Sequence, residues 1–125
     1  MAKVLIADDS RFQVRMFSTW LKELGFETVT AGDALQAWMT ALRALPDLIL
    51  LDINMPAGSG VQVLRKLQNS AKTQHIPVIV ISANEDRDLH SVVEQLGAAA
   101  FLLKPVEEAE LCSVIARLFP EAPAR

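Results

Sequence analysis

Five polar or charged side chains of this sequence directly follow short apolar segments, and together they could share one chemical task. In chain order they are Asp8 and Asp9 after residues 4–7, Asp52 after 48–51, Ser82 after 76–81, and Lys104 after 98–103. Apolar runs of this length are typical of strands buried on both faces of a parallel sheet. The carboxyl ends of such strands share one edge, where ligands bind. The sequence therefore predicts one cleft with three carboxylates, a hydroxyl and an ammonium.

The chemistry of such a cleft is restricted by its charge. Three crowded carboxylates destabilise one another, and the single ammonium of Lys104 cannot offset them. Oxygen ligands favour Mg²⁺, with Mn²⁺ as an alternative, over zinc. A metal ion, a lysine and a hydroxyl around one carboxylate form a set that binds phosphoryl groups. The carboxylate itself can be the nucleophile and form an acyl phosphate.

Each of these residues also has a purely structural interpretation when it is considered alone. Asp9 or Ser10 could cap a helix, Ser82 could be a turn residue, and Lys104 could be a solvated charge. Their occurrence at the ends of successive strands favours the chemical interpretation.

Apolar and amphipathic segments alternate five times along the chain. Strands are predicted at residues 3–7, 27–31, 48–51, 76–81 and 98–103, and helices at residues 11–24, from 33, from 61, from 83 and at 107–119. This alternation predicts an α/β doubly wound parallel sheet with helices on both faces, (βα)5. The second strand alternates polar and apolar residues, which favours a place at the sheet edge.

Helical periodicity predicts which residues face the sheet. Large apolar side chains are expected to face inward: Phe12, Met16, Phe17, Trp20, Leu21 and Leu24 in the first helix, Leu35, Trp38, Met39 and Leu42 in the second, and Leu89, Val92, Val93 and Leu96 in the fourth. His75 and His90 lie away from the strand ends, so both are expected to be solvated.

Composition limits the class of protein. The chain has 125 residues, 51% of them hydrophobic, and a net charge of −3. These values indicate a single globular domain and, without a basic tract, no direct nucleic-acid binding. No apolar run is long enough to insert in a membrane, and residues 1–4 do not resemble a signal peptide. The single Cys112 cannot form an internal disulfide, so a cytoplasmic location is expected.

The ordered set of motifs resembles the receiver domain of two-component response regulators, including chemotaxis regulators. The matching motifs are Val4-Leu5-Ile6-Ala7-Asp8-Asp9-Ser10, Leu50-Leu51-Asp52-Ile53-Asn54-Met55-Pro56 with Gly60, Val80-Ile81-Ser82-Ala83, and Gly97-Ala98 with Phe101-Leu102-Leu103-Lys104-Pro105. The resemblance implies a flavodoxin-like sheet with strand order 2-1-3-4-5. It implies a receiver domain over residues 1–119 and a short tail at 120–125.

The resemblance also implies the acceptor and the metal ligands. Asp52 would accept a phosphoryl group from a phosphohistidine of a histidine kinase or a histidine phosphotransfer protein. Asp9, Asp52 and the backbone carbonyl of Asn54 would coordinate Mg²⁺, and Asp8 would help through water. The domain would catalyse only its own phosphorylation and slow dephosphorylation.

The remaining roles concern the phosphoryl group and the response to it. Ser82 and the backbone N–H of Ala83 would hold phosphoryl oxygens, and Lys104 would pair with another. A cis bond before Pro105 is expected. Ser82 and Phe101 would act as the switch, and the face made by the fourth helix, fifth strand and fifth helix would control a protein partner. A phosphorylation-dependent homodimer is one form that this output could take.

The main alternative is a small Mg²⁺-dependent phosphatase or phosphotransferase with an aspartyl nucleophile. The halo-acid dehalogenase type places a general-acid Asp two residues after its nucleophile, where this chain has Asn54. A nucleotide-binding domain is a third idea, but no glycine-rich loop follows the first strand. The sequence leaves open a stand-alone receiver, a phosphorelay shuttle and the N-terminal part of a longer regulator.

Overall fold

A computed structural model describes residues 2–56 and 58–120, which form five parallel strands alternating with five helices. The elements are β1 (Lys3–Ala7), α1 (Arg11–Glu23), β2 (Glu27–Ala31), α2 (Ala34–Ala44), β3 (Leu48–Asp52), α3 (Gly60–Gln68), β4 (Val78–Ser82), α4 (Arg87–Gln95), β5 (Ala100–Leu103) and α5 (Glu108–Leu118). The strand order is β2-β1-β3-β4-β5. This confirms the predicted (βα)5 fold class and the edge position of β2. Residues 121–125 of the predicted tail lie outside the described residues.

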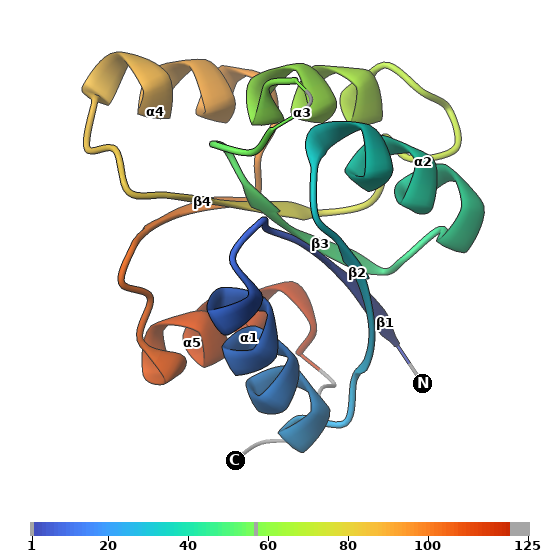
Figure 1. Ribbon diagram of the computed structural model, residues 1–125, viewed down its shortest axis with the longest axis vertical. Helices are drawn as coiled ribbons and strands as arrows, with labels where there is room; N and C mark the ends of the chain where they lie inside the picture. Colours follow the sequence, from blue (N-terminus) through green and yellow to red (C-terminus); the bar gives the residue numbers. More distant parts are fainter. Residues whose placement is uncertain (1, 57, 121–125) are drawn as a thin grey trace.

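The sheet separates two helical layers (Figure 1). Helices α2, α3 and α4 cover one face, and α1 and α5 cover the other. Side chains of β3 alternate between the two cores: Ile49 and Leu51 join the first, and Leu48 and Leu50 join the second. Both faces of the central strands are therefore apolar, and polar chemistry is confined to the strand ends. No helix among the described residues is long and apolar enough to cross a membrane.

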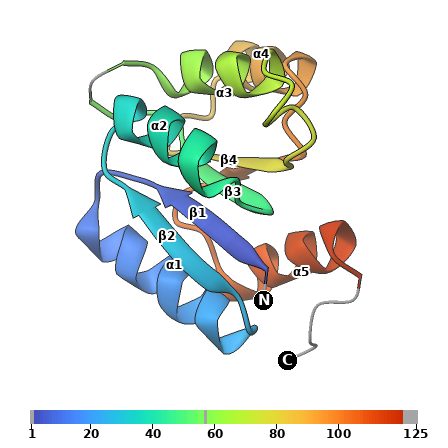
Figure 2. The same ribbon diagram turned by 90° about the vertical axis from the view of Figure 1, so that its right-hand side faces the viewer.

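The strand register brings the predicted cleft residues to one edge. Ala7 pairs with Leu51, so Asp8 and Asp52 are the next residues along their strands. Asp52 pairs with Ile81, and Ser82 pairs with Leu103, the residue before Lys104. Since parallel strands present their carboxyl ends together, the register alone predicts that these side chains meet. Figure 2 shows β1, β2 and β3 running in the same direction.

Ser10 is the N-cap of α1. Its hydroxyl accepts a hydrogen bond of 3.3 Å from the backbone N–H of Gln13. The helix therefore has its cap without a contribution from the neighbouring Asp9. At the other end, Gly25 follows the C-cap residue Leu24 with a φ of 91°, a left-handed conformation that glycine adopts readily after a helix.

The predicted inner face of α2 is wrong for Leu35 and Met39, whereas Trp38 is half-buried and packs against the core. Leu35 and Met39 are 56% and 52% exposed, whereas the side chains buried against the sheet are the small ones, Ala34, Ala37 and Ala41. Alanines let the helix backbone approach the strands closely. Both sides of α2 are apolar, so periodicity could not tell which one faces inward.

Helix α4 begins later than predicted, at Arg87 rather than near Ala83. The Ser82 hydroxyl accepts from the backbone N–H of Asn84, and the Asn84 side chain accepts from that of Asp86. These local bonds hold the segment in turns instead of a helix. Two inward assignments are also wrong, because Val92 is 39% exposed on α4 and Phe12 is 72% exposed on α1.

Gly60, the first residue of α3, lies against the backbone that follows β3. Its N–H donates to the carbonyl of Ile53 at 3.1 Å. A Cβ at this position would lie 2.6 Å from Ile53 Cα and 2.8 Å from the Asp52 carbonyl oxygen. We expect Gly60→Ala to lower the free energy of unfolding by about 1–3 kcal/mol, because backbone atoms must move to admit the methyl group. Chemical denaturation measures this directly.

Gly32→Ala is the matched control. A Cβ at Gly32 would meet no atom within 4 Å, so the free energy of unfolding should change by less than about 0.5 kcal/mol. Equal effects of the two substitutions would show that close packing at Gly60 does not constrain the end of β3.

Candidate functional site

Asp52 is the last residue of β3 and is only 4% exposed. One carboxylate oxygen, Oδ1, accepts from the backbone N–H of Asn54 at 3.1 Å. The other, Oδ2, accepts from Lys104 Nζ at 3.3 Å. Burial raises the pKa of Asp52, and the nearby charge of Asp8 adds to this, while the Asn54 N–H and the Lys104 ammonium oppose it.

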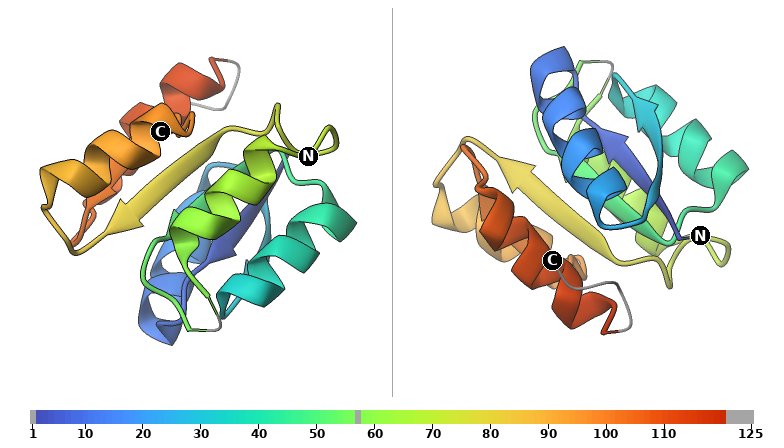
Figure 3. Two further views of the ribbon diagram at one scale, coloured as in Figure 1. Left: turned by 90° about the horizontal axis from the view of Figure 1, so that it is seen from above. Right: turned by 90° about the horizontal axis from the view of Figure 1, so that it is seen from below.

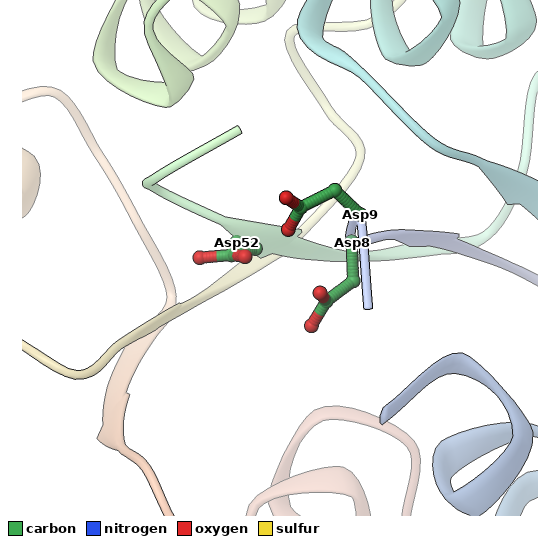
Figure 4. Close-up of side chains that lie close together, drawn as sticks. All are labelled: Asp8, Asp9 and Asp52. Atoms are coloured by element: carbon green, nitrogen blue, oxygen red, sulfur yellow. The ribbon is translucent and has the colours of Figure 1, made fainter. Parts of the chain in front are cut away.

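Asp8, Asp9 and Asp52 form an acidic cluster at the ends of β1 and β3 (Figure 4). One carboxylate oxygen from each lies within 4.8 Å of the others. Asp8 is buried, and its Oδ1 accepts from the backbone N–H of Ser10 at 2.9 Å. Its Oδ2 is buried without a hydrogen bond, although Lys104 Nζ lies 3.4 Å away. An unsatisfied carboxylate oxygen beside two further carboxylates fits a divalent cation with oxygen ligands.

Lys104 is the cation that faces this cluster. Its side chain is 21% exposed, and Nζ lies between Asp8 and Asp52 rather than in solvent. The backbone of Lys104 is held beside the end of β4, because the Lys104 N–H donates to the Ser82 carbonyl at 2.9 Å. The peptide bond to Pro105 is cis, as predicted. The solvated-charge interpretation of Lys104 is therefore wrong.

Ser82 and the loop after it complete the edge. Ser82 is fully buried at the end of β4, and its Oγ accepts from the backbone N–H of Asn84 at 3.0 Å. The hydroxyl hydrogen remains available to an acceptor in the cleft. Ala83 is exposed, and among the described residues its backbone N–H has no hydrogen-bond acceptor. Asn54 is also exposed, one residue beyond the buried Ile53.

These groups can neutralise and hold an anionic oxygen group next to a carboxylate nucleophile. Residues 4–116 match the family model of the response regulator receiver domain. The chain belongs to this family. Receiver domains are signalling switches rather than enzymes that turn over an external substrate.

Known proteins agree with this assignment. The receiver domain is 39% identical over 110 residues to the response regulator PleD of Caulobacter vibrioides, a match that covers 88% of this chain and 24% of PleD. It is 32% identical over 103 residues to the polar-differentiation response regulator DivK of Brucella ovis, covering 82% of this chain and 84% of DivK. The CheX–CheY–BeF₃–Mg²⁺ complex of Borrelia burgdorferi has a TM-score of 0.88 at 29% identity, with coverage of 94% and 89%.

Phe101 lies on β5 in register with Val80 and is half-buried. The ring of His90 from α4 stacks on it, with centroids 4.6 Å apart and planes 17° apart. His90 Nε2 also lies 3.9 Å from Glu94 on the same helix. No sequence pattern predicts this stack, because His90 and Phe101 belong to different elements. The receiver domain thus has an aromatic pair between α4 and β5. One side of the His90 ring contacts Phe101, and the residue is still exposed to solvent, as expected.

The predicted site residues divide into two groups in the structure. Asp8, Asp52 and Lys104 are in direct contact, and Asp9 joins their acidic cluster. Asn54 reaches the cluster through its backbone N–H, which donates to Asp52 Oδ1. Ser82, Ala83 and Phe101 lie on the same edge or the adjacent strand, with no hydrogen bond to that cluster among the described residues. His75 is exposed in the connection before β4, as expected.

We expect Asp52→Asn to stabilise the metal-free receiver domain. The substitution removes a buried charge but keeps an acceptor for the Asn54 N–H, so the free energy of unfolding at neutral pH should rise by about 1 kcal/mol. Because the pKa of Asp52 is raised in the folded state, protonation favours folding at low pH. That contribution is lost as the pH rises through the raised pKa, so the difference between wild type and variant should widen with pH.

Urea denaturation in EDTA at several pH values measures this difference. Asp88→Asn, an exposed carboxylate on α4, is the control and should show no comparable gain. A loss of stability in Asp52→Asn at neutral pH would mean that the pair with Lys104 outweighs the cost of burying the charge.

Proposed function

We propose that this receiver domain is a phosphorylation-activated switch with Asp52 as its phosphoacceptor. The observation that carries the proposal is the buried Asp52 carboxylate, which belongs to the acidic cluster and also pairs with the ammonium of Lys104. The donor would be a phosphohistidine of a histidine kinase or a histidine phosphotransfer protein. A cytoplasmic location fits such a donor. The proposal concerns this domain alone, since the chain spans only 24% of the length of PleD.

In the transfer step an Asp52 carboxylate oxygen forms a bond to phosphorus as the bond from phosphorus to the donor imidazole nitrogen breaks. The electron pair returns to the imidazole, which takes up a proton, and an acyl phosphate remains on the domain. Lys104 reaches the Asp52 carboxylate and can pair with a phosphoryl oxygen. The Ser82 hydroxyl and the backbone N–H of Ala83 lie on the same edge, and we propose that they would donate to the other oxygens.

Mg²⁺ fits the acidic cluster, with Mn²⁺ as an alternative. We propose Asp9, Asp52 and the Asn54 backbone carbonyl as its ligands, and Asp8 as a residue that acts through water. When bound, the ion would neutralise charge on the carboxylates and on the phosphoryl oxygens. Support comes from the unsatisfied Asp8 Oδ2, and the similar CheY of Borrelia burgdorferi has BeF₃ and Mg²⁺ in its complex.

The response would pass from Ser82 to Phe101. A phosphoryl group on Asp52 supplies new acceptor oxygens, so Ser82 would exchange its bond from Asn84 for one to the phosphoryl group. Phe101 would then rotate inward beneath α4 and leave the ring of His90. The face of α4, β5 and α5 would change, and a protein partner or a second copy of the domain would recognise it.

Labelling with acetyl phosphate tests the acceptor. We expect the wild-type domain to become phosphorylated only when Mg²⁺ is present, and Asp52→Asn to reduce the labelled fraction at least tenfold, because the asparagine amide cannot replace the carboxylate as the nucleophile. Phosphate-affinity electrophoresis measures the labelled fraction.

Asp88→Asn again serves as the control and should label like the wild type. Normal labelling of Asp52→Asn would overturn the site assignment. Continuous release of phosphate over many turnovers would instead support the alternative, a small aspartyl phosphatase.

A further inference from the structure

Helix α2 has an apolar side that the sheet does not use. Leu35 and Met39 are more than half exposed, and Leu45, the C-cap residue, is 50% exposed. Trp38 and Leu42 lie beside them and are half-buried. The alanine side of α2 makes the buried contact with the sheet, and on this second side Trp38 also packs against the core, whereas Leu35 and Met39 remain exposed. Large apolar side chains gathered on a surface indicate an interaction site.

Helix α2 packs beside α3 (Figures 2 and 3), and a groove lies between residues of these two helices. It has a volume of about 640 Å³ and is lined by Trp38, Gln62, Arg65, Lys66, Asn69 and Ser70. Lys66 Nζ lies 6.0 Å from the centroid of the Trp38 ring. The groove therefore has an aromatic side chain from α2 and two cationic side chains, Arg65 and Lys66, from α3. We call Leu35, Trp38, Met39, Arg65 and Lys66 the α2–α3 surface.

The charge of this surface is opposite to that of the whole chain. The sequence from 53 to 84 has no acidic residue, and neither does α2, although the net charge of the chain is −3. Arg65 and Lys66 are exposed, and within the described residues neither has an ion-pair partner. The acidic residues of α4 and its N-cap, Asp86, Asp88 and Glu94, belong to a different helix. The α2–α3 surface thus combines apolar side chains with unpaired positive charge.

We propose that the α2–α3 surface binds an acidic amphipathic helix of a partner protein. The apolar side of that helix would cover Leu35, Met39 and Trp38, because helices dock through side chains spaced three or four residues apart. Its carboxylates would pair with Arg65 and Lys66, and this complementarity would select the partner. The surface is separate from both the acidic cluster and the face of α4, β5 and α5, so it extends the proposed function to a second protein contact.

NMR titration of the ¹⁵N-labelled full chain tests the proposal. The probe is a synthetic helical peptide with leucine at every third or fourth position and glutamate at most others. We expect chemical-shift changes concentrated in α2 and α3. The double variant Arg65→Glu/Lys66→Glu should weaken binding at least tenfold, because it reverses the charge facing the peptide. Leu35→Gln/Met39→Gln should weaken it similarly without a loss of stability, since both side chains are exposed.

Matched controls separate this surface from general electrostatics. Arg11→Glu/Arg15→Glu makes the same charge change on the exposed side of α1 and should leave peptide affinity within about twofold. A peptide with lysine in place of glutamate should not bind. Equal binding of the lysine peptide, shifts centred outside α2 and α3, or unchanged affinity of both double variants would overturn the proposal. Self-association of the chain that Arg65→Glu/Lys66→Glu abolishes would also overturn it, by identifying a second copy as the occupant.

Discussion

The burial of the Asp52 carboxylate at the end of an apolar strand is the constraint on which the site depends. A carboxylate that is 4% exposed has lost most of its water, and the loss raises its pKa. The backbone N–H of Asn54 and the ammonium of Lys104 replace part of that hydration. The repulsion from Asp8 remains uncompensated. The excess negative charge of the three carboxylates favours binding of a cation, and the Lys104 ammonium favours binding of a group with anionic oxygens.

The parallel sheet itself, more than the loops, positions the side chains of the site. Each comes from the last residue of a strand or the one or two residues after it, and the strand register sets their spacing. The loop after Asp52 also touches α2, because the N–H of Ala34 donates to the carbonyl of Pro56 at 3.0 Å. The segment that begins at the proposed phosphoacceptor thus reaches the first residue of α2.

The sequence was informative wherever a single physical requirement acted on a segment. Continuous apolar runs predicted the buried strands, and their polar ends predicted the cluster of Asp8, Asp52 and Lys104. Prediction failed where two requirements competed. Helix α2 is apolar on two sides, and only packing shows that its alanines face the sheet while Leu35 is exposed. The stack of His90 on Phe101 depends on the placement of α4 against β5, which no local pattern encodes.

The most direct test of Asp52 as the phosphoacceptor is chemical trapping of the acyl phosphate. Borohydride reduces an acyl phosphate to an alcohol and releases phosphate, whereas free carboxylates do not react. After phosphorylation with Mg²⁺ and acetyl phosphate, peptide mass spectrometry should find homoserine at position 52 and unmodified aspartate at positions 8 and 9. Reduction at Asp8 or Asp9, or labelling without any reduced residue, would contradict the assignment of Asp52.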